Sequence, residues 1–105
     1  MSRDAIDIDA VTRTLDAWAG AEIAVRVVSD SDDLIAVWIG RLGEREQSRA
    51  PALFWPVTSP AEHEHDERPG IWVHPERLSD AWLHTGAFVV ELRHGDVTLN
   101  VRRLH

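Results

Sequence analysis

The chain has 105 residues, a formal net charge of −7 at pH 7 and a hydrophobic fraction of 44%, which suits one soluble domain with a single core. Cysteine is absent, so disulfides, thiol nucleophiles and cysteine-bound zinc are excluded. All eleven basic residues are arginine and they form no basic run. Nucleic acid is therefore a poor partner, because phosphate backbones favour basic surfaces.

The N-terminal residues alternate acidic with apolar side chains and lack the basic start and apolar stretch of a signal peptide. No apolar run approaches the roughly 20 residues needed to cross a bilayer. We therefore expect a cytoplasmic protein with no membrane partner. The free use of arginine and alanine, with no lysine or tyrosine, is typical of a GC-rich bacterial genome.

Residues 8–19 are predicted to form an amphipathic helix. Its apolar residues recur at spacings of three and four, which places them on one stripe; they are Ile8, Val11, Leu15 and Trp18. Asp7 is a natural N-cap, and Gly20 can end the helix in a left-handed conformation. The stripe is expected to pack on a sheet.

Two strands are expected next, over 22–29 and 34–44, joined by an acidic turn at 30–33. The first strand alternates, with Ile23 and Val25 on one face. The second is apolar on both faces. That pattern favours a central strand, or a strand of a closed barrel, over an edge strand.

Residues 51–57 are predicted to form a short strand, and Pro51 and Pro56 argue that it lies at a sheet edge. Consecutive apolar residues on an edge cannot all face inward, so this strand predicts an exposed aromatic contact surface. Its residues are Leu53, Phe54 and Trp55, with Arg41 and Arg45 at the rim. The alternative is that tryptophan fills the core of a small domain that lacks tyrosine.

Residues 58–69 are expected to form a loop that contains "HEHDE". In an extended segment side chains two apart point the same way, so both histidines could reach one ion of zinc or another divalent transition metal. The candidate ligands are His63, His65, Glu67 or Asp66, and His74 on the next strand. A flexible acidic loop without cofactor is the leading interpretation. A pH-responsive patch, in which carboxylates favour charged histidines, is the third.

The remaining elements are a strand over 70–74, a helix over 75–85 and a hairpin. Pro75 fits the first turn of that helix and Gly86 closes it; a strand over 81–85 is the alternative. Residues 87–93 and 97–103 each alternate apolar and polar side chains, and "HGD" between them supplies the turn glycine.

The expected fold is a single α+β domain over residues 1–105, with the order α-β-β-β-β-α-β-β and helices on one side of a mostly antiparallel, twisted sheet. With a short second helix the order becomes a helix and a five-stranded barrel, which is similar to Sm-like barrels that form rings on RNA. The order α-β-β-β-α-β-β instead resembles acidic secretion-chaperone-type domains that bind proteins. Both resemblances cover element order and transfer no residue role.

The sequence contains no nucleophile elbow, phosphate-binding glycine loop or dinucleotide fingerprint. We therefore expect a non-enzymatic protein that acts through protein contacts, as an adaptor, a chaperone-like partner or a self-assembling homo-oligomer. Two other functions stay open. One is a metal- or small-ligand-binding protein that uses the loop with His63 and His65, and the other is a ring-forming, Sm-like RNA binder.

Overall fold

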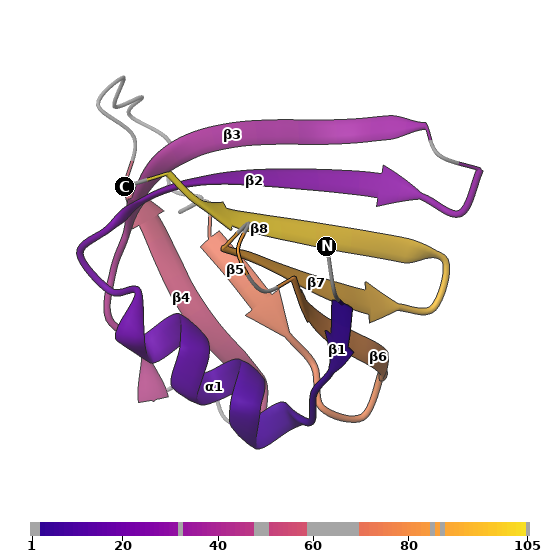
Figure 1. The fold of residues 1–105 in the computed structure, drawn as a ribbon, viewed down its shortest axis with the longest axis horizontal. Coiled ribbons are helices and arrows are strands. Elements are labelled where there is room, and N and C mark those ends of the chain that lie inside the picture. The colour runs from indigo at the N-terminus through magenta and orange to yellow at the C-terminus, as the bar shows by residue number, and fades with distance from the viewer. Residues whose placement is uncertain are drawn as a thin grey trace.

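The computed structural model describes residues 3–31, 33–47, 51–58, 70–84, 86 and 88–104. Over these ranges the chain forms one short helix and an eight-stranded antiparallel sheet that curls into a half-barrel (Figure 1). The elements are β1 (Arg3–Ala5), α1 (Ile8–Ala17), β2 (Glu22–Ser29), β3 (Leu34–Leu42), β4 (Leu53–Thr58), β5 (Gly70–Val73), β6 (Leu78–His84), β7 (Val89–His94) and β8 (Val97–Arg103). The strand order in the sheet is β1-β6-β7-β8-β2-β3-β4-β5.

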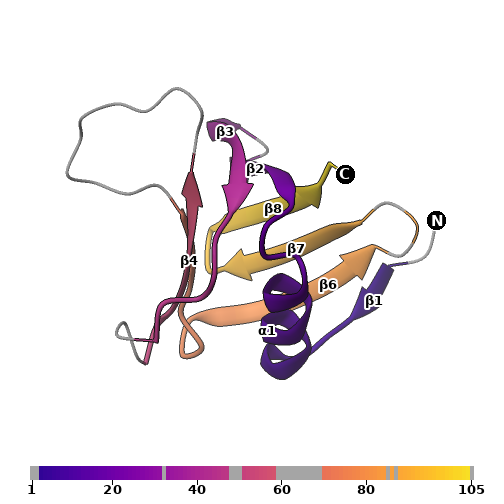
Figure 2. The ribbon, with the colours of Figure 1, turned by 90° about the vertical axis from the view of Figure 1, so that its left-hand side faces the viewer.

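Helix α1 forms in the segment where the spacing of apolar residues predicts a helix. The Asp7 carboxylate accepts a hydrogen bond of 2.8 Å from the Ala10 N–H, which satisfies an N-terminal donor of the helix. Beyond the helix Gly20 has a φ of +89°, and its N–H donates to the Leu42 carbonyl at 2.7 Å. Figure 2 shows α1 in front of β6 on the open side of the curled sheet, with β4 on one side of the helix and β1 on the other.

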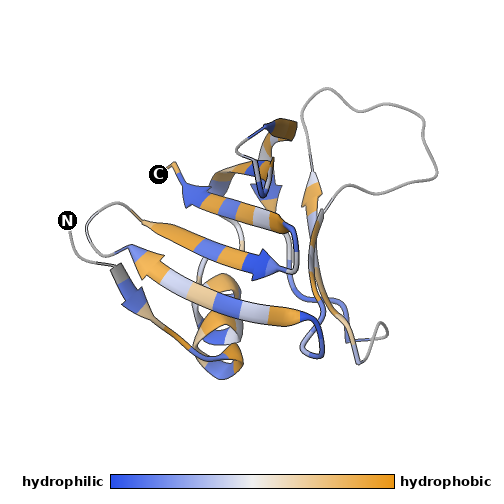
Figure 3. Cartoon of the chain, turned by 90° about the vertical axis from the view of Figure 1, so that its right-hand side faces the viewer, coloured by the Kyte–Doolittle hydropathy of each residue, from blue (hydrophilic) through white to orange (hydrophobic). Residues whose placement is uncertain are grey.

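The core lies inside the curl, between α1 and the inner faces of the strands. Buried residues alternate with less buried ones along β7 and the first half of β2, and Figure 3 shows bands of alternating hydropathy along the strands. The buried core residues are Val11, Leu15, Trp18, Ile23, Val25, Leu42, Trp55, Val57, Ile71, Val73, Ala81, Val90, Leu92 and Val101. The hairpin of β7 and β8 confirms the prediction from alternation, with Val90 opposite Val101 and Leu92 opposite Leu99.

The sheet turns sharply where β4 crosses β3, and two glycines make this crossing close. A Cβ atom on Gly40 would lie 2.6 Å from the Thr58 carbonyl oxygen, and one on Gly43 would lie 2.9 Å from Pro56. Among the described residues, β3 and β4 pair through Arg41 with Thr58 and Leu42 with Val57. Strands β4 and β5 then run at a steep angle to the rest of the sheet (Figure 2).

The predicted second helix is wrong. Residues 75–77 form a tight turn, in which the N–H groups of Arg77 and Leu78 both donate to the His74 carbonyl at 2.9 Å, and strand β6 follows. Strand β6 pairs with β1 on one flank and β7 on the other. Pairing on both flanks outweighs the weak helical spacing of this stretch. The chain is broadly α+β but mostly sheet, so the predicted element order and the five-stranded barrel do not describe it.

The predicted edge position of β4 is also wrong, because β4 lies between β3 and β5 and the sheet ends at β1 and β5. Pro56 is tolerated for a geometric reason. Its carbonyl accepts from the Gly43 N–H at 2.7 Å, so its nitrogen also faces away from β5. The missing N–H therefore removes no bond to β5.

Candidate functional site

An apolar strip on the outer face of β3 is the main candidate. Four side chains are about half exposed, and we call them the β3 strip: Leu34 56%, Ile35 57%, Val37 50% and Ile39 49%. The register with β2 sets Val37 beside Arg26 on the outer face. A bulge then leaves Ile35 unpaired and sets Leu34 opposite Val28, which returns Leu34 to that face.

The sheet order places β3 between β2 and β4, as the predicted central position requires, but the face that carries the strip is not covered. Only the opposite face turns inward, with Leu42 buried and Trp38 packed against the core. The β3 strip had one sequence signal, namely that residues 34–40 contain no charge. That signal does not distinguish a doubly buried strand from a strand with one open apolar face.

One flank of β3 is open over most of its length. Residues 34–40 pair with β2 on one side, and in the described part of the chain no strand pairs with them on the other. The Leu42 N–H donates toward the β2 side, to Ala21, and the Gly43 N–H donates toward β4, to Pro56. Since backbone groups alternate between flanks along a strand, Val37 and Ile39 direct their N–H and C=O groups to the open flank. Figure 1 shows β3 as the outermost strand on this side.

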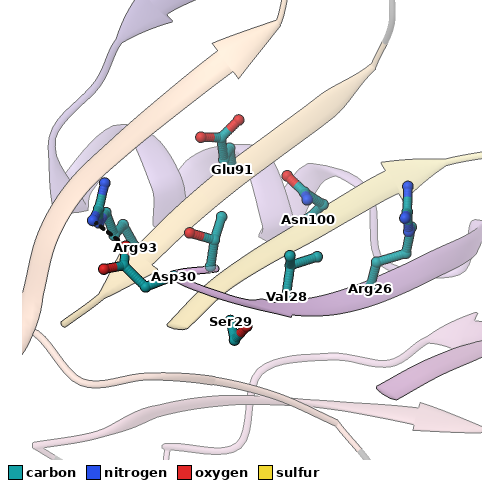
Figure 4. Close-up of a pocket in the computed structure, with 8 residues that line it drawn as sticks. Arg26, Val28, Ser29, Asp30, Glu91, Arg93 and Asn100 are labelled. Carbon is teal, nitrogen blue, oxygen red and sulfur yellow. Dashed lines mark hydrogen bonds and ion pairs between the residues drawn. The ribbon is translucent and has the colours of Figure 1, made fainter. Parts of the chain in front are cut away.

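Beside the strip lies a polar hollow of about 430 Å³ on the outer faces of β2, β7 and β8 (Figure 4). It is lined by Arg26, Val28, Ser29, Asp30, Glu91, Arg93, Thr98 and Asn100. Arg93 donates to Asp30 at 2.8 Å, and Glu91 contacts His84 at 3.1 Å. Two arginines and two carboxylates line this hollow, so their formal charges cancel and it favours neither cations nor anions.

The exposed positions predicted for Phe54 and Trp55 are wrong, since they are 2% and 0% exposed. Leu53 is half-buried against the core. The Trp55 Nε1–H donates to the Asp16 carboxylate at 2.8 Å, and Arg45 binds the same carboxylate at 3.3 Å. Trp55 packs in the core and the Phe54 ring is covered by the Trp72 ring, so we propose no contact role for these side chains.

Arg41, predicted as a rim residue of the same surface, is exposed at the end of β3. It lies opposite Glu22 of β2 and Thr58 of β4. Of the five predicted contact residues it is the one adjacent to the β3 strip.

The outer side of β4 and β5 carries a row of rings. The ring centroids of Phe54 and Trp72 are 4.4 Å apart, and those of Trp72 and His74 and of His74 and His94 are each 6.1 Å apart. The His74 backbone N–H donates to the His94 Nε2 at 3.1 Å. Burial lowers the pKa of His94 below its usual 6.5, and the nearby His74 and Arg77 lower it further. His94 therefore acts as a neutral acceptor in this row.

The structure does not test the predicted metal site in the 58–69 loop. His63, His65, Asp66 and Glu67 lie outside the described residues. The remaining predicted ligand, His74, belongs to the row of rings. Within the described ranges no group of three or more histidine, aspartate or glutamate side chains gathers as a metal site would require.

Comparisons of this chain with protein-family models, with curated proteins and with solved structures find no match. Among the described residues no helix has the length and apolar character to cross a membrane.

Proposed function

We propose that this chain is a non-enzymatic protein-interaction domain whose binding element is β3. One observation carries the proposal. The same stretch, residues 34–40, combines half-exposed apolar side chains with backbone groups directed to an open flank. The stretch contains neither a charge nor a proline, which are the residues that usually protect an open strand from pairing.

Both halves of this combination favour a protein partner. An added strand gains backbone hydrogen bonds along the open flank, and apolar side chains on alternate positions give that strand its register. The strip adds a hydrophobic contribution of about 25 cal/mol for each Å² of apolar surface removed from water. An open apolar strand that stayed uncovered would be an aggregation hazard.

The polar hollow supports a ligand-binding function less well. Arg93 is paired with Asp30, and Glu91 with His84, so much of its lining is already satisfied. An RNA-binding function is also less well supported, because the chain is acidic and the charges of the hollow cancel. The proposal therefore gives the hollow no role.

Site-specific photo-crosslinking tests the proposal. A photoreactive phenylalanine analogue replaces Val37 in one sample and Phe88 in a control; Phe88 is 55% exposed and lies outside β3. Each protein is incubated with nuclease-treated lysate of the source organism and irradiated, and the adducts are identified by mass spectrometry. We expect protein adducts, including any with a second copy, from position 37 well above those from position 88. Equal adducts from both positions would refute the proposal.

A further inference from the structure

We propose that the polar hollow on the outer face of β2, β7 and β8 is a binding site for a neutral, polyhydroxylated ligand of the size of one sugar ring. This site goes beyond the proposed function, because it uses side chains outside the β3 strip and does not depend on what covers that strip. Its ligand class follows from the charge balance of the hollow, its free hydrogen-bonding groups and its size.

Six of the lining residues form two rows that cross three strands, β2, β8 and β7. The rows are Arg26–Asn100–Glu91 and Val28–Thr98–Arg93, in which each residue lies opposite the next. Since every second residue of a strand faces the same side, both rows share the outer face. The uncharged amide and hydroxyl groups of β8 therefore lie in the middle of the hollow, with the charged groups on the neighbouring strands (Figure 4).

The charge balance of the hollow favours a neutral ligand. Arg93 donates to Asp30 at 2.8 Å, and Glu91 contacts His84 at 3.1 Å. An ionic ligand would compete with these pairs or meet a like charge beside its binding partner, whereas a neutral ligand does neither. The pairs also hold Arg93 and Glu91 in place, so less side-chain freedom is lost when a ligand binds.

Three side chains of the hollow keep free hydrogen-bonding groups. Within the described ranges Arg26, Thr98 and Asn100 make no side-chain hydrogen bond or ion pair. The guanidinium only donates, whereas the hydroxyl and the amide both donate and accept. A carboxylate or phosphate only accepts, so it would leave the Asn100 carbonyl facing another acceptor. Sugar hydroxyl groups donate and accept, so they can satisfy all three side chains.

The size of the hollow fits one sugar ring. Neighbouring strands lie about 4.8 Å apart and alternate residues of a strand about 6.8 Å apart, so three strands and two rows span roughly 10 by 7 Å. The volume of about 430 Å³ lies near the lower end of the range for small-molecule sites. Val28 supplies apolar surface for the C–H groups of the ring. The site therefore suits a monosaccharide or the terminal sugar of a glycan.

Nuclear magnetic resonance of the ¹⁵N-labelled chain tests this site, because Asn100 is the only asparagine of the sequence. Its side-chain NH₂ signals therefore report directly on the middle of the hollow. The chain is titrated with the methyl glycosides of D-glucose, D-galactose and D-mannose, and with glucuronate and glucosamine as anionic and cationic probes. We expect at least one neutral glycoside to shift the Asn100 side-chain signals, and the two charged probes to bind more weakly.

Two variants of similar shape locate the contact. Thr98→Val and Asn100→Leu remove polar groups from the middle of the hollow, and each should weaken binding about three- to ten-fold, as the loss of one hydrogen bond does. Thr58→Val is the matched control, because Thr58 is exposed on β4 and does not line the hollow. This control should bind as the wild type does. Backbone amide spectra establish that all three variants are folded.

Three results would overturn the inference. The first is that no neutral glycoside shifts the Asn100 side-chain signals. The second is that glucuronate or glucosamine binds at least as tightly as the neutral glycosides, which would exclude the ligand class. The third is an affinity that neither Thr98→Val nor Asn100→Leu changes, which would locate binding elsewhere. Crosslinking from position 37 tests the proposed function separately, so that function stands or fails independently of these results.

Discussion

Asp16 shows how one side chain at the surface of α1 holds a buried residue of another element. Its carboxylate is 39% exposed and accepts the indole N–H of Trp55, which is 0% exposed, at 2.8 Å. Arg45 donates to the same carboxylate at 3.3 Å. The helix, β4 and the segment after β3 therefore meet at one acceptor group.

Replacing Asp16 with alanine should destabilise the fold by about 1–3 kcal/mol, because it leaves the buried Trp55 N–H without its acceptor. Asp16→Asn keeps an acceptor oxygen and loses mainly the partly exposed ion pair with Arg45, so its cost should stay below about 1 kcal/mol. Urea unfolding of both variants measures the difference. Equal losses would show that the indole hydrogen bond contributes nothing beyond the ion pair.

His94 makes the stability of the fold depend on pH. Its pKa in the folded state is lowered by burial, then by the nearby His74 and Arg77, below the ordinary value of 6.5. The unfolded chain therefore binds the proton first as the pH falls. We expect a loss of stability that begins near the unfolded pKa of 6.5 and ends once the pH is below the folded pKa.

A His94→Gln variant isolates this contribution, because its amide oxygen can accept the His74 N–H and does not titrate. Urea unfolding between neutral pH and about pH 5 should show a steeper loss for the wild type than for the variant. Parallel pH profiles for the two proteins would disprove the role of His94.

At the scale of elements, Gly40 decides where β4 leaves β3. Its missing side chain lets the Thr58 carbonyl approach a position that a Cβ atom would crowd at 2.6 Å. The crossing turns β4 and β5 toward α1, where Trp55 and Ile71 join the core. In the described part of the chain this crossing follows two β3–β4 residue pairs, and no strand there pairs with the outer flank of residues 34–40.

A Gly40→Ala substitution should therefore destabilise the protein by about 1–3 kcal/mol, because backbone has to move to admit the methyl group. Gly95→Ala is the matched control. Gly95 has a φ of +59° and open space at its Cβ position, so alanine there costs about 1 kcal/mol of backbone strain without a clash. Urea unfolding gives the two costs, and tryptophan fluorescence should change for Gly40→Ala alone. Native fluorescence together with a cost no larger than that of Gly95→Ala would contradict this role.

At the scale of the whole molecule, the curl of the sheet divides the apolar residues into two groups. The inner face and α1 enclose the core, and the outer face combines the polar hollow with the β3 strip. The net charge of −7 opposes association of like copies, and its effect falls with salt. The β3 strip itself carries no charge, so a partner that covers it meets no like charge within the strip.

Several elements could be predicted from the sequence because their causes are local. The cap at Asp7 and the spacing of Val11, Leu15 and Trp18 determine α1 through neighbours within a few residues along the chain. The alternation of 97–103 and the turn glycine at Gly95 determine the last hairpin in the same way. Because these interactions join residues that are close together along the chain, the sequence alone is enough to predict them.

The other features of the fold depend on contacts between residues that are far apart along the chain. Strand β6 exists because β1 and β7 pair with it, whereas its own sequence also fits a helix. Trp55 is buried and Val37 is exposed although both lie in apolar stretches, because burial depends on which face of the curled sheet meets α1. Local pattern thus determined the helix, the hairpin and most strand positions. Only the tertiary structure decided which apolar face of β3 stays open, since the β4 crossing at Gly40 sets the course of the sheet.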